Sequence, residues 1–333
     1  MATAIEPVLR KQLVDRRDKL QAAANGFHRP DELTRLLHEV DDALRRMDIG
    51  VFGLCEVCHD SVETERLIAD PLTRVCIDHL TAKEQRALEE DLELAAQIQA
   101  GLLPTAYKSI DGWEVAYHYQ PAGAVSGDYC DLINGDDSSW MFVVGDVSGK
   151  GVAASMLMAH LQAMFRTLIS INLPLEQMVE RASRVFCEST LPTQYATLVC
   201  GRVGHNGEVE VCNAGHLPPL LIQNGSVRTL AATGLPVGVF CSESFSVSKF
   251  QMNVGDSLFL YTDGFSELAD VSGSEFGVAR LSRLMEGNGN LAPRALIDLS
   301  IRELRAFGEG RAPTDDLTLM AIRRNGSSLN KTV

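Results

Sequence analysis

The sequence is short of basic residues. Against 44 aspartates and glutamates it has only 30 lysines and arginines, which leaves a formal net charge of −14 over 333 residues at pH 7. Binding to nucleic acid needs a basic surface that neutralises phosphates, so this balance excludes broad nucleic-acid binding. A phosphorylated substrate would have to be met by metal cations or by a local basic patch.

Long apolar segments are also missing. No run approaches the roughly 18 apolar residues of a bilayer-spanning helix, so no membrane association is expected. The first thirty residues mix charged side chains with short apolar pairs and lack the apolar core and cleavage pattern of a signal peptide. We therefore expect a soluble cytoplasmic protein with one substantial core and a smaller accessory unit.

The eight cysteines are distributed unevenly. Three of them cluster in the first quarter of the chain: Cys55, Cys58 and Cys76. The other five are scattered through apolar stretches: Cys130, Cys187, Cys200, Cys212 and Cys241. This distribution favours reduced thiols plus one metal site over a disulfide scaffold.

The first hundred residues have a helical pattern. Two helices are indicated over 6–25 and 31–48, separated by Asn25-Gly26 and Pro30. A linker helix is indicated over 81–104, where apolar side chains recur at the a and d spacing of a short coiled coil. Those apolar positions are Leu88, Leu92, Ala95 and Leu102, with polar Gln85 and Gln99 completing the series. Two interpretations stay open: the helix joins two chains as a homodimer, or it rests on the next domain.

After Pro104, short β-rich runs are interspersed with helical stretches. The expected strands lie in GWEVAYHYQ, SWMFVVG, YATLVCGRV, EVEVCNAG, LPPLLIQNG, DSLFLYTDG and DDLTLMAIRR. Helices are expected over 152–169, 175–190 and 293–307. Because several strands cluster around hairpin turns such as Asn224-Gly225, the pattern indicates antiparallel sheets flanked by helices, an α+β fold.

The segment WMFVVGDVSGKG, residues 140–151, ends an apolar run in a glycine-rich turn. A Walker-type phosphate loop requires Gly-x-x-x-x-Gly-Lys-Ser/Thr, but Gly151 follows Lys150 and Val144 stands in place of the first glycine. A nucleotide loop is therefore excluded. The remaining feature is Asp146 at the end of a buried strand, beside glycines that allow a ligand close to the backbone.

A carboxylate at the end of an apolar strand occurs four times. The aspartates are Asp128, Asp146, Asp263 and the pair Asp315-Asp316. Burying several carboxylates together is costly unless cations neutralise them. Oxygen ligands without histidine favour Mn²⁺ or Mg²⁺ over Zn²⁺. Two such ions can hold a bridging hydroxide and a phosphoryl group for in-line displacement.

Residues 94–324 resemble the SpoIIE/RsbU branch of the metal-dependent (PPM) serine/threonine phosphatases. The likeness rests on seven motifs in order: AAQIQAGLLP, SGDYCDL, GDVSGKGVAASMLMA, NAGHLPPLL, GLPVGVF, GDSLFLYTDGFSEL and DDLTLMAI. It implies the PPM fold, an antiparallel β-sandwich flanked by helices, and a phosphoprotein phosphatase with two Mn²⁺ or Mg²⁺ ions. It also implies, as substrate, a phosphorylated anti-anti-sigma protein with a STAS domain in partner-switching signalling.

The resemblance implies roles for single residues. Asp146 would bridge both metal ions, with the Val147 carbonyl beside it. Asp128 would bind one ion mainly through water, while Asp263 and Asp315 would complete the shell of the other. Asp146 and Asp128 are thus the candidate catalytic residues, and the reaction is attack by a metal-bridging hydroxide. Asp316 is expected to cap its strand instead.

Two positions depart from the broader family. The histidine that follows the bridging aspartate by two positions is Ser148 here, so protonation of the leaving group is assigned to metal-bound water. The arginine that grips the substrate phosphate in eukaryotic members has no clear counterpart, and Lys150 is the candidate for that role. His216, within the NAGH motif, is expected to be structural rather than catalytic.

The cysteine cluster has the spacing of a metal site. Cys55-x2-Cys58 is followed, after seventeen residues, by Cys76-x2-His79. Two such knuckles form a closed tetrahedral set, which favours one structural Zn²⁺ ion. His59 is the rival fourth ligand, and a haem-c attachment site and a redox Cys-x-x-Cys pair are the alternatives considered.

Residues 33–80 are similar to the DksA/TraR-type zinc finger, with His79 where most members have a fourth cysteine. The Asp-x-x-Asp-x-Ala tip through which members of that type can act on RNA polymerase is incomplete at 15–20, because Leu20 replaces the alanine. A polymerase role is not expected, and the finger is expected to sense or dock something. The expected segments are N-terminal helices over 1–50, a zinc finger over 51–80, the linker helix over 81–104, a phosphatase domain over 105–325 and a disordered tail over 326–333.

Two functions of other classes stay open. A non-catalytic zinc-finger regulator, whose phosphatase-like domain only binds a partner, would be marked by loss of metal carboxylates, yet all four are present. A phosphohydrolase acting on nucleotides or other small molecules would be marked by a base-binding loop, and none is recognisable.

Overall fold

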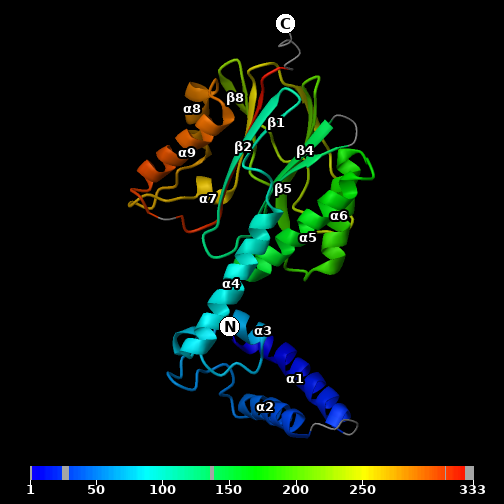
Figure 1. Cartoon of the computed structure of the whole chain (residues 1–333), viewed down its shortest axis with the longest axis vertical. Coiled ribbons are helices and arrows are strands. Elements are labelled where there is room, and N and C mark those ends of the chain that lie inside the picture. Colours follow the sequence, from blue (N-terminus) through cyan, green and yellow to red (C-terminus); the bar gives the residue numbers. More distant parts are fainter. Residues whose placement is uncertain (1, 25–29, 136–138, 312, 327–333) are drawn as a thin grey trace. The chain divides into compact units, whose positions relative to one another are not determined.

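The computed structural model describes residues 2–24, 30–135, 139–311 and 313–326. The chain forms two compact units, residues 1–91 and 92–333, and the division falls inside helix α4 (Ala82–Leu102) (Figure 1). The tail that the sequence predicts to be disordered lies, from 327 on, outside the described residues.

The first unit is mainly helical. Its elements are α1 (Ala2–Ala24), α2 (Pro30–Asp48), α3 (Thr64–Ala69) and the short 3-10 helix η1 (Ile77–His79). Helix α2 buries Val40, Leu44 and Met47, a stripe with the spacing of an amphipathic helix. This stripe forms one core cluster with Leu9 and Leu13 of α1 and with the cysteine-bearing segment that follows α2.

The second unit contains two antiparallel sheets. The six-stranded sheet has the order β1-β2-β11-β10-β7-β8, and the five-stranded sheet has the order β3-β4-β5-β6-β9. The strands of the first are β1 (Tyr107–Ile110), β2 (Trp113–Gln120), β7 (Leu220–Gln223), β8 (Ser226–Thr229), β10 (Ser257–Tyr261) and β11 (Leu317–Arg324). Those of the second are β3 (Asp128–Asn134), β4 (Ser139–Val147), β5 (Ala196–Gly204), β6 (Glu208–Ala214) and β9 (Ser248–Gln251).

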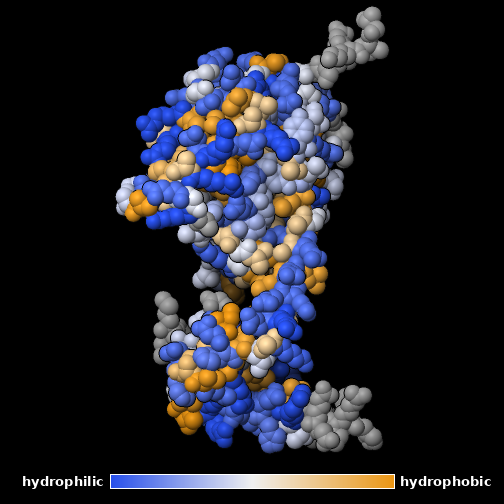
Figure 2. All heavy atoms as spheres, turned by 60° about the vertical axis from the view of Figure 1, so that its left-hand side comes forward, coloured by the Kyte–Doolittle hydropathy of each residue, from blue (hydrophilic) through white to orange (hydrophobic). Residues whose placement is uncertain are grey.

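Helices cover the outer face of each sheet (Figure 1). Helices α5 (Gly151–Ile169) and α6 (Leu175–Ser189) share a core cluster with the five-stranded sheet, and α8 (Val278–Asn288) and α9 (Pro293–Phe307) share one with the six-stranded sheet. A third cluster lies between the sheets, where Trp113 and Trp140 meet edge to face with centroids 6.2 Å apart. The outer face of α8 and α9, turned forward in Figure 2, is mostly hydrophilic. The predicted α+β sandwich flanked by helices is confirmed.

Helix α5 is, in the part of the chain that the structure describes, the one helix long and apolar enough to cross a membrane. Three of its apolar side chains, Met158, Leu161 and Phe165, are buried in the core cluster that α5 shares with β3, β4 and α6. Near its C-terminus, Arg166 donates two hydrogen bonds, of 2.9 and 2.8 Å, to the buried carboxylate of Asp131 in β3.

One expectation about the cysteines is wrong. Cys187 of α6 and Cys241 form a disulfide, with Cα atoms 5.3 Å apart, although 54 positions separate them in the chain. The pair forms because the turn after Val237 returns the chain to α6. The scattered cysteines Cys130, Cys200 and Cys212 are free and buried in the core, as expected.

Candidate functional site

Two of the predicted carboxylates meet where β3 and β4 pair. Asp128 and Asp146 are register partners in the antiparallel ladder. The carboxylate of Asp128 is buried, and its Oδ2 accepts hydrogen bonds from the hydroxyls of Thr262 at 2.9 Å and Thr318 at 2.5 Å. Its other oxygen, Oδ1, is buried without a hydrogen-bond partner among the described residues. An unpartnered buried carboxylate oxygen is costly and calls for a ligand.

The other carboxylates arrive from the six-stranded sheet. Strands β10 and β11 pair antiparallel. Directly after β10, the Thr262 N–H continues this pairing and donates to the Thr318 carbonyl of β11 at 3.0 Å. The turn that carries Asp263 then lies directly on the backbone of Asp315 and Asp316. A Cβ at Gly264 would stand 2.0 Å from the Asp316 carbonyl oxygen, so only glycine permits this approach. Asp263 and Asp315 are brought together in this way.

The carboxylates repel one another. Burial, with the charges of Asp263 and Asp315, raises the pKa of Asp146 to about 7. Burial and the Asp315 charge raise the pKa of Asp263 above its usual value, and burial raises that of Asp128 well above its usual range. Closely placed carboxylates of this kind are stabilised as anions by divalent cations. The residues present therefore fit a site for Mn²⁺ or Mg²⁺.

The pair Asp315-Asp316 divides into two environments. Asp316 is buried, and its two oxygens accept from the Ala122 and Gly127 N–H groups, each at 2.8 Å, so it holds the loop before Asp128. Asp315 is half-buried, and its Oδ2 lies 2.8 Å from the Lys150 ammonium. The expectation that Asp316 caps its strand is therefore wrong, because its oxygens hold the loop instead. The role of Asp315 as a metal ligand stays a prediction.

A cavity of about 330 Å³ opens beside Asp146 and Asp263. Its lining is Asp146, Ser148, Tyr195, Thr197, Gly215, His216, Leu217, Pro218, Asp263 and Glu267. None of these described lining residues is a lysine or arginine. A phosphate in this cavity would therefore need cations from elsewhere.

His216 lies in the lining of this cavity as a neutral structural residue. Its Nε2 is 3.1 Å from the Tyr261 carbonyl oxygen and its Nδ1 is 2.8 Å from the Thr197 hydroxyl. Nε2 therefore carries the proton and Nδ1 accepts. Burial lowers the pKa of His216 to about 4. These contacts fit the structural role expected for it.

Ser148 occupies the place where the broader family has a histidine. Its N–H donates to the Tyr195 carbonyl at 2.9 Å, and its Oγ accepts from the Tyr195 N–H, also at 2.9 Å. Lys150 follows in a turn between Gly149 and Gly151, which both have positive φ. The hydrogen bond from Lys150 to Asp315 raises the pKa of its ammonium, so it stays charged.

Several residues that build the site were missed in the sequence. Thr262, directly after β10, and Thr318 of β11 hold Asp128 from far along the chain. In the sequence, only their positions close to Asp263 and Asp316 hinted at this. The coiled-coil series of the linker helix includes Gln99, but this residue is buried within the second unit, where it bonds to Ser126. It therefore does not face a partner chain.

The four expected zinc ligands come together in the first unit. One ligand atom each from Cys55, Cys58, Cys76 and His79 lies within 4.8 Å of all the others. The Cys76 sulfur is 3.1 Å from Nδ1 of His79. In the described part of the chain this is the one group of three or more potential ligands that is so compact, and His59 is not in it. Three thiols and an imidazole suit a tetrahedral Zn²⁺ ion.

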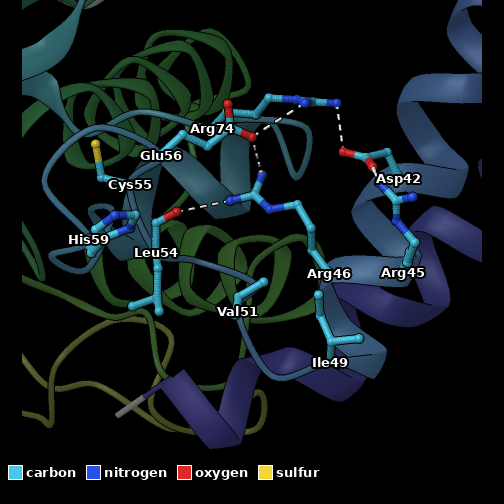
Figure 3. Close-up of a pocket in the computed structure, with 10 residues that line it drawn as sticks. All are labelled: Asp42, Arg45, Arg46, Ile49, Val51, Leu54, Cys55, Glu56, His59 and Arg74. Atoms are coloured by element: carbon cyan, nitrogen blue, oxygen red, sulfur yellow. Dashed lines mark hydrogen bonds and ion pairs between the residues drawn. The ribbon is translucent and has the colours of Figure 1, made fainter.

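An arginine network ties this cluster to α2 (Figure 3). Arg46 donates to the Leu54 carbonyl at 2.9 Å and lies 3.6 Å from Glu56, the residue after Cys55. Arg74 bridges Glu56, at 3.3 Å, and Asp42 of α2, at 2.8 Å. These side chains line a cavity of about 460 Å³. The network fixes the first knuckle against the helix.

Comparison with known proteins gives three relatives of note. The chain is 26% identical to the protein IcfG of Synechocystis over 264 residues, which is 71% of this chain and 42% of IcfG. It is 24% identical to the phosphoserine phosphatase RsbU of Bacillus subtilis over 245 residues, 72% of each chain. The solved RsbU and RsbW domains of Rv1364c from Mycobacterium tuberculosis match with 28% identity and a TM-score of 0.59, over 68% of this chain and 64% of that one. The chain thus spans less than half the length of IcfG.

The family comparison covers the region that contains three of the four candidate metal-binding aspartates, and Asp128 lies before it. Residues 136–325, more than half of the chain, match the model of the family described as stage II sporulation protein E, SpoIIE. That range includes Asp146, Asp263 and Asp315, and the sandwich around them has the PPM fold of the structures it resembles. The chain belongs to the SpoIIE family.

Proposed function

We propose that the second unit is a serine/threonine phosphoprotein phosphatase of the PPM type that depends on Mn²⁺ or Mg²⁺. The relatives RsbU and RsbP of Bacillus subtilis, both named phosphoserine phosphatases, support this activity. The observation that carries the proposal is the buried, unpartnered Oδ1 of Asp128 next to Asp146, at the meeting point of the two sheets.

The carboxylates would hold two cations between the sheets. We assign Asp146, together with the Val147 carbonyl, to both ions. Asp128 would bind one of them, and Asp263 and Asp315 would bind the other. Bound there, such cations polarise a phosphoryl oxygen and lower the pKa of water. The two threonine hydroxyls on Asp128 leave its free oxygen aimed in a fixed direction, and Gly264 keeps Asp263 against the Asp315 backbone.

Lys150 is assigned to the substrate phosphate. No basic residue is among the described residues that line the cavity beside Asp146, whereas the Lys150 charge acts on Asp263, Asp315 and Asp316. The lysine side chain is 67% exposed, so its ion pair with Asp315 contributes little stability. Exchanging Asp315 for a substrate phosphate would therefore cost little. It would orient the phosphoryl group from the open side of the site.

The substrate class is tested by comparing turnover of a phosphoserine peptide with that of ATP, both with Mn²⁺. We expect metal-dependent hydrolysis of the peptide and slower hydrolysis of the nucleotide. Faster turnover of ATP would identify a small-molecule phosphohydrolase. If neither is hydrolysed with any divalent cation, the non-catalytic binding protein becomes the better explanation.

As the physiological substrate we assign a phosphorylated STAS-domain anti-anti-sigma protein in a partner-switching circuit. The similarity to RsbU and to a protein with RsbU and RsbW domains supports this assignment. The test is release of phosphate from such a protein phosphorylated on serine, with a phosphothreonine peptide as the comparison.

In the first unit we propose one structural Zn²⁺ ion held by Cys55, Cys58, Cys76 and His79. The compact cluster supports it. Burial raises the pKa of the Cys55 thiol, but backbone hydrogen bonds, among them that from the Val57 N–H, lower it overall, whereas the neighbouring Cys55 charge contributes to raising the pKa of Cys58. The DksA/TraR likeness would make this unit a docking or sensing module.

We also propose a homodimer through α4. With Gln99 buried, the exposed apolar side chains of the second half of the helix are Leu94, at 56%, and Ile98, at 60% exposure. They lie four residues apart, on one face, and would pack against a second copy. Sedimentation of an Ile98→Glu variant tests this, since we expect the dimer to become a monomer. A dimer that persists would contradict this contact.

A further inference from the structure

The Cys187–Cys241 disulfide is accessible to solvent. Cys187 is half-buried near the C-terminus of α6, and Cys241 is exposed. The free cysteines of the second unit, Cys130, Cys200 and Cys212, are by contrast fully buried. A thiol in solution can therefore reach this pair without unfolding the core. Accessibility is what separates exchangeable disulfides from inert ones.

The disulfide anchors one end of a segment that we call the cavity strap, residues 233–241. At its other end, the N–H groups of Thr233 and Gly234 donate to the Asn213 carbonyl at 2.8 and 3.2 Å. Pro236 packs on Gly215, where a Cβ would stand 2.6 Å from the proline ring. The strap thus supports the side of the phosphatase cavity formed by Gly215 and His216.

The strap also supports the neighbouring part of the cavity wall, which includes Thr197 of β5. Val237 and Ala196 exchange two backbone hydrogen bonds, of 2.8 and 2.9 Å. Ala196 is in turn the register partner of Val147 in β4, the residue directly after Asp146. A continuous backbone ladder therefore runs from the strap through β5 to the segment that carries the candidate bridging carboxylate.

Beyond Val237, few contacts other than the disulfide hold the strap on α6. The Gly238 N–H donates to the Ser183 hydroxyl at 3.3 Å, and Gly238 lies against the Phe186 ring. Val239 and Phe240 are exposed, at 41% and 56%. Among the described residues, the contacts of Gly238 with Ser183 and Phe186 remain there without the covalent bond. The chain next meets α6 at Phe245, whose N–H donates to the Glu180 carboxylate at 3.4 Å.

We propose that Cys187–Cys241 is a thiol-exchange site through which a dithiol reductant controls the geometry of the phosphatase cavity. The oxidised form holds the strap on α6 and keeps the cavity wall beside it in place, and the reduced form releases the strap. This regulatory role rests on the proposed phosphatase function, whereas the exchange reaction and the loosening of the strap do not.

The exchange is a two-electron reaction. A thiolate of the dithiol attacks one sulfur of the pair, the S–S bond breaks, and the other cysteine leaves as a thiolate that takes up a proton. The second thiol of the reductant then attacks the mixed disulfide, releasing the remaining cysteine. The products are two cysteine thiols and the oxidised reductant, so the dithiol supplies both electrons.

Hydrogen exchange on the full-length protein tests the loosening directly. Oxidised and dithiothreitol-treated protein are compared over peptides 194–198 and 233–241, and alkylation followed by mass spectrometry reports which cysteines are free. We expect reduction to speed amide exchange in both peptides by about tenfold or more, because the opening free energy of the strap falls. We also expect kcat/KM for a phosphate ester to fall several-fold.

A Cys187→Ser/Cys241→Ser double variant is the matched control. It keeps Cys55, Cys58 and Cys76, so any effect of the reductant on the first unit is present in both proteins. In peptides 194–198 and 233–241, we expect the variant to exchange like reduced protein and to be insensitive to dithiothreitol. Alkylation of both cysteines in the oxidised protein would overturn the proposal, as would equal exchange of oxidised and reduced protein in peptides 194–198 and 233–241. Loosening without any metal-dependent turnover would instead indicate that the phosphatase function fails while the exchange site stands.

Discussion

The side-chain amide of Gln99 pairs with both the backbone N–H and the backbone carbonyl of Ser126. Its Nε2 donates to the Ser126 carbonyl at 2.7 Å, and its Oε1 accepts from the Ser126 N–H at 2.9 Å. The Ser126 hydroxyl in turn accepts from the N–H of Asp128 at 3.0 Å. Helix α4, which leads out of the first unit, is therefore joined by hydrogen bonds to the loop that positions a candidate metal ligand.

Replacing Gln99 by alanine should destabilise the second unit. It leaves a buried donor and a buried acceptor of Ser126 without partners, at a cost of about 1–3 kcal/mol. Urea unfolding of Gln99→Ala against Gln97→Ala measures this, because Gln97 is an exposed residue of the same helix. Equal stability of the two variants would show that the Ser126 peptide finds other partners.

Loss of the Lys150 charge should affect turnover but not stability. Its pair with Asp315 is on the surface, so Lys150→Met should change the free energy of unfolding by less than about 1 kcal/mol. If Lys150 binds the substrate phosphate, kcat/KM should fall about tenfold. This ratio corresponds to about 1.4 kcal/mol, roughly the net free energy of one hydrogen bond to a charged group. Lys249→Met, which removes a comparable surface pair with Glu210, is the control. A drop of the same size in both variants would argue against a specific role.

His216 makes stability depend on pH. Its folded pKa of about 4 lies below the value of about 6.5 for an unfolded histidine. Between these two pKa values, His216 is protonated in the unfolded chain but neutral in the folded protein. The contribution of the neutral imidazole to the free energy of unfolding is therefore complete above about pH 6.5 and is lost as the pH falls toward 4. The loss should approach about 3 kcal/mol.

His216→Gln, which keeps a donor for the Tyr261 carbonyl, should show a correspondingly smaller loss. Urea unfolding at pH 7 and pH 4 measures the difference, with His205→Gln at an exposed position as the control. Identical pH dependence of wild type and His216→Gln would mean that the buried imidazole accepts a proton in the folded state.

The zinc proposal separates two histidines. His79→Ala should lose bound zinc, because Nδ1 of His79 completes the compact cluster, whereas His59→Ala should retain it. Elemental analysis of the two purified variants reads zinc directly. Zinc retained in His79→Ala and lost in His59→Ala would reverse the ligand assignment.

Much of the fold was predictable because its inner strands are apolar runs bounded by turns. β5 and β11 lie where the sequence indicated strands, and α9 has the predicted bounds of 293–307. The short edge strands β1 and β8 were not predicted, because only part of each faces the core and their apolar signal is weak.

The site was predictable to a lesser degree. The position of the aspartates next to apolar runs indicates a site in the sequence. No such pattern indicates the residues that hold the aspartates in place. Thr318 reaches Asp128 across 190 positions, and the Cys187–Cys241 pair spans 54. Such partners are set by sheet order and register, which local patterns do not contain. Whether Gln99 is buried or faces a second chain depends likewise on which face of α4 packs against the second unit.

The most direct test of the account is hydrolysis of a phosphoserine peptide, with and without Mn²⁺, by the wild-type chain and by Asp146→Asn. The substitution keeps the size of the side chain and relieves repulsion from Asp263 and Asp315, so the variant should fold. We expect turnover that requires Mn²⁺ in the wild type and falls by at least about a hundredfold in the variant. Turnover that survives in Asp146→Asn, or that ignores the metal, would contradict the central claim.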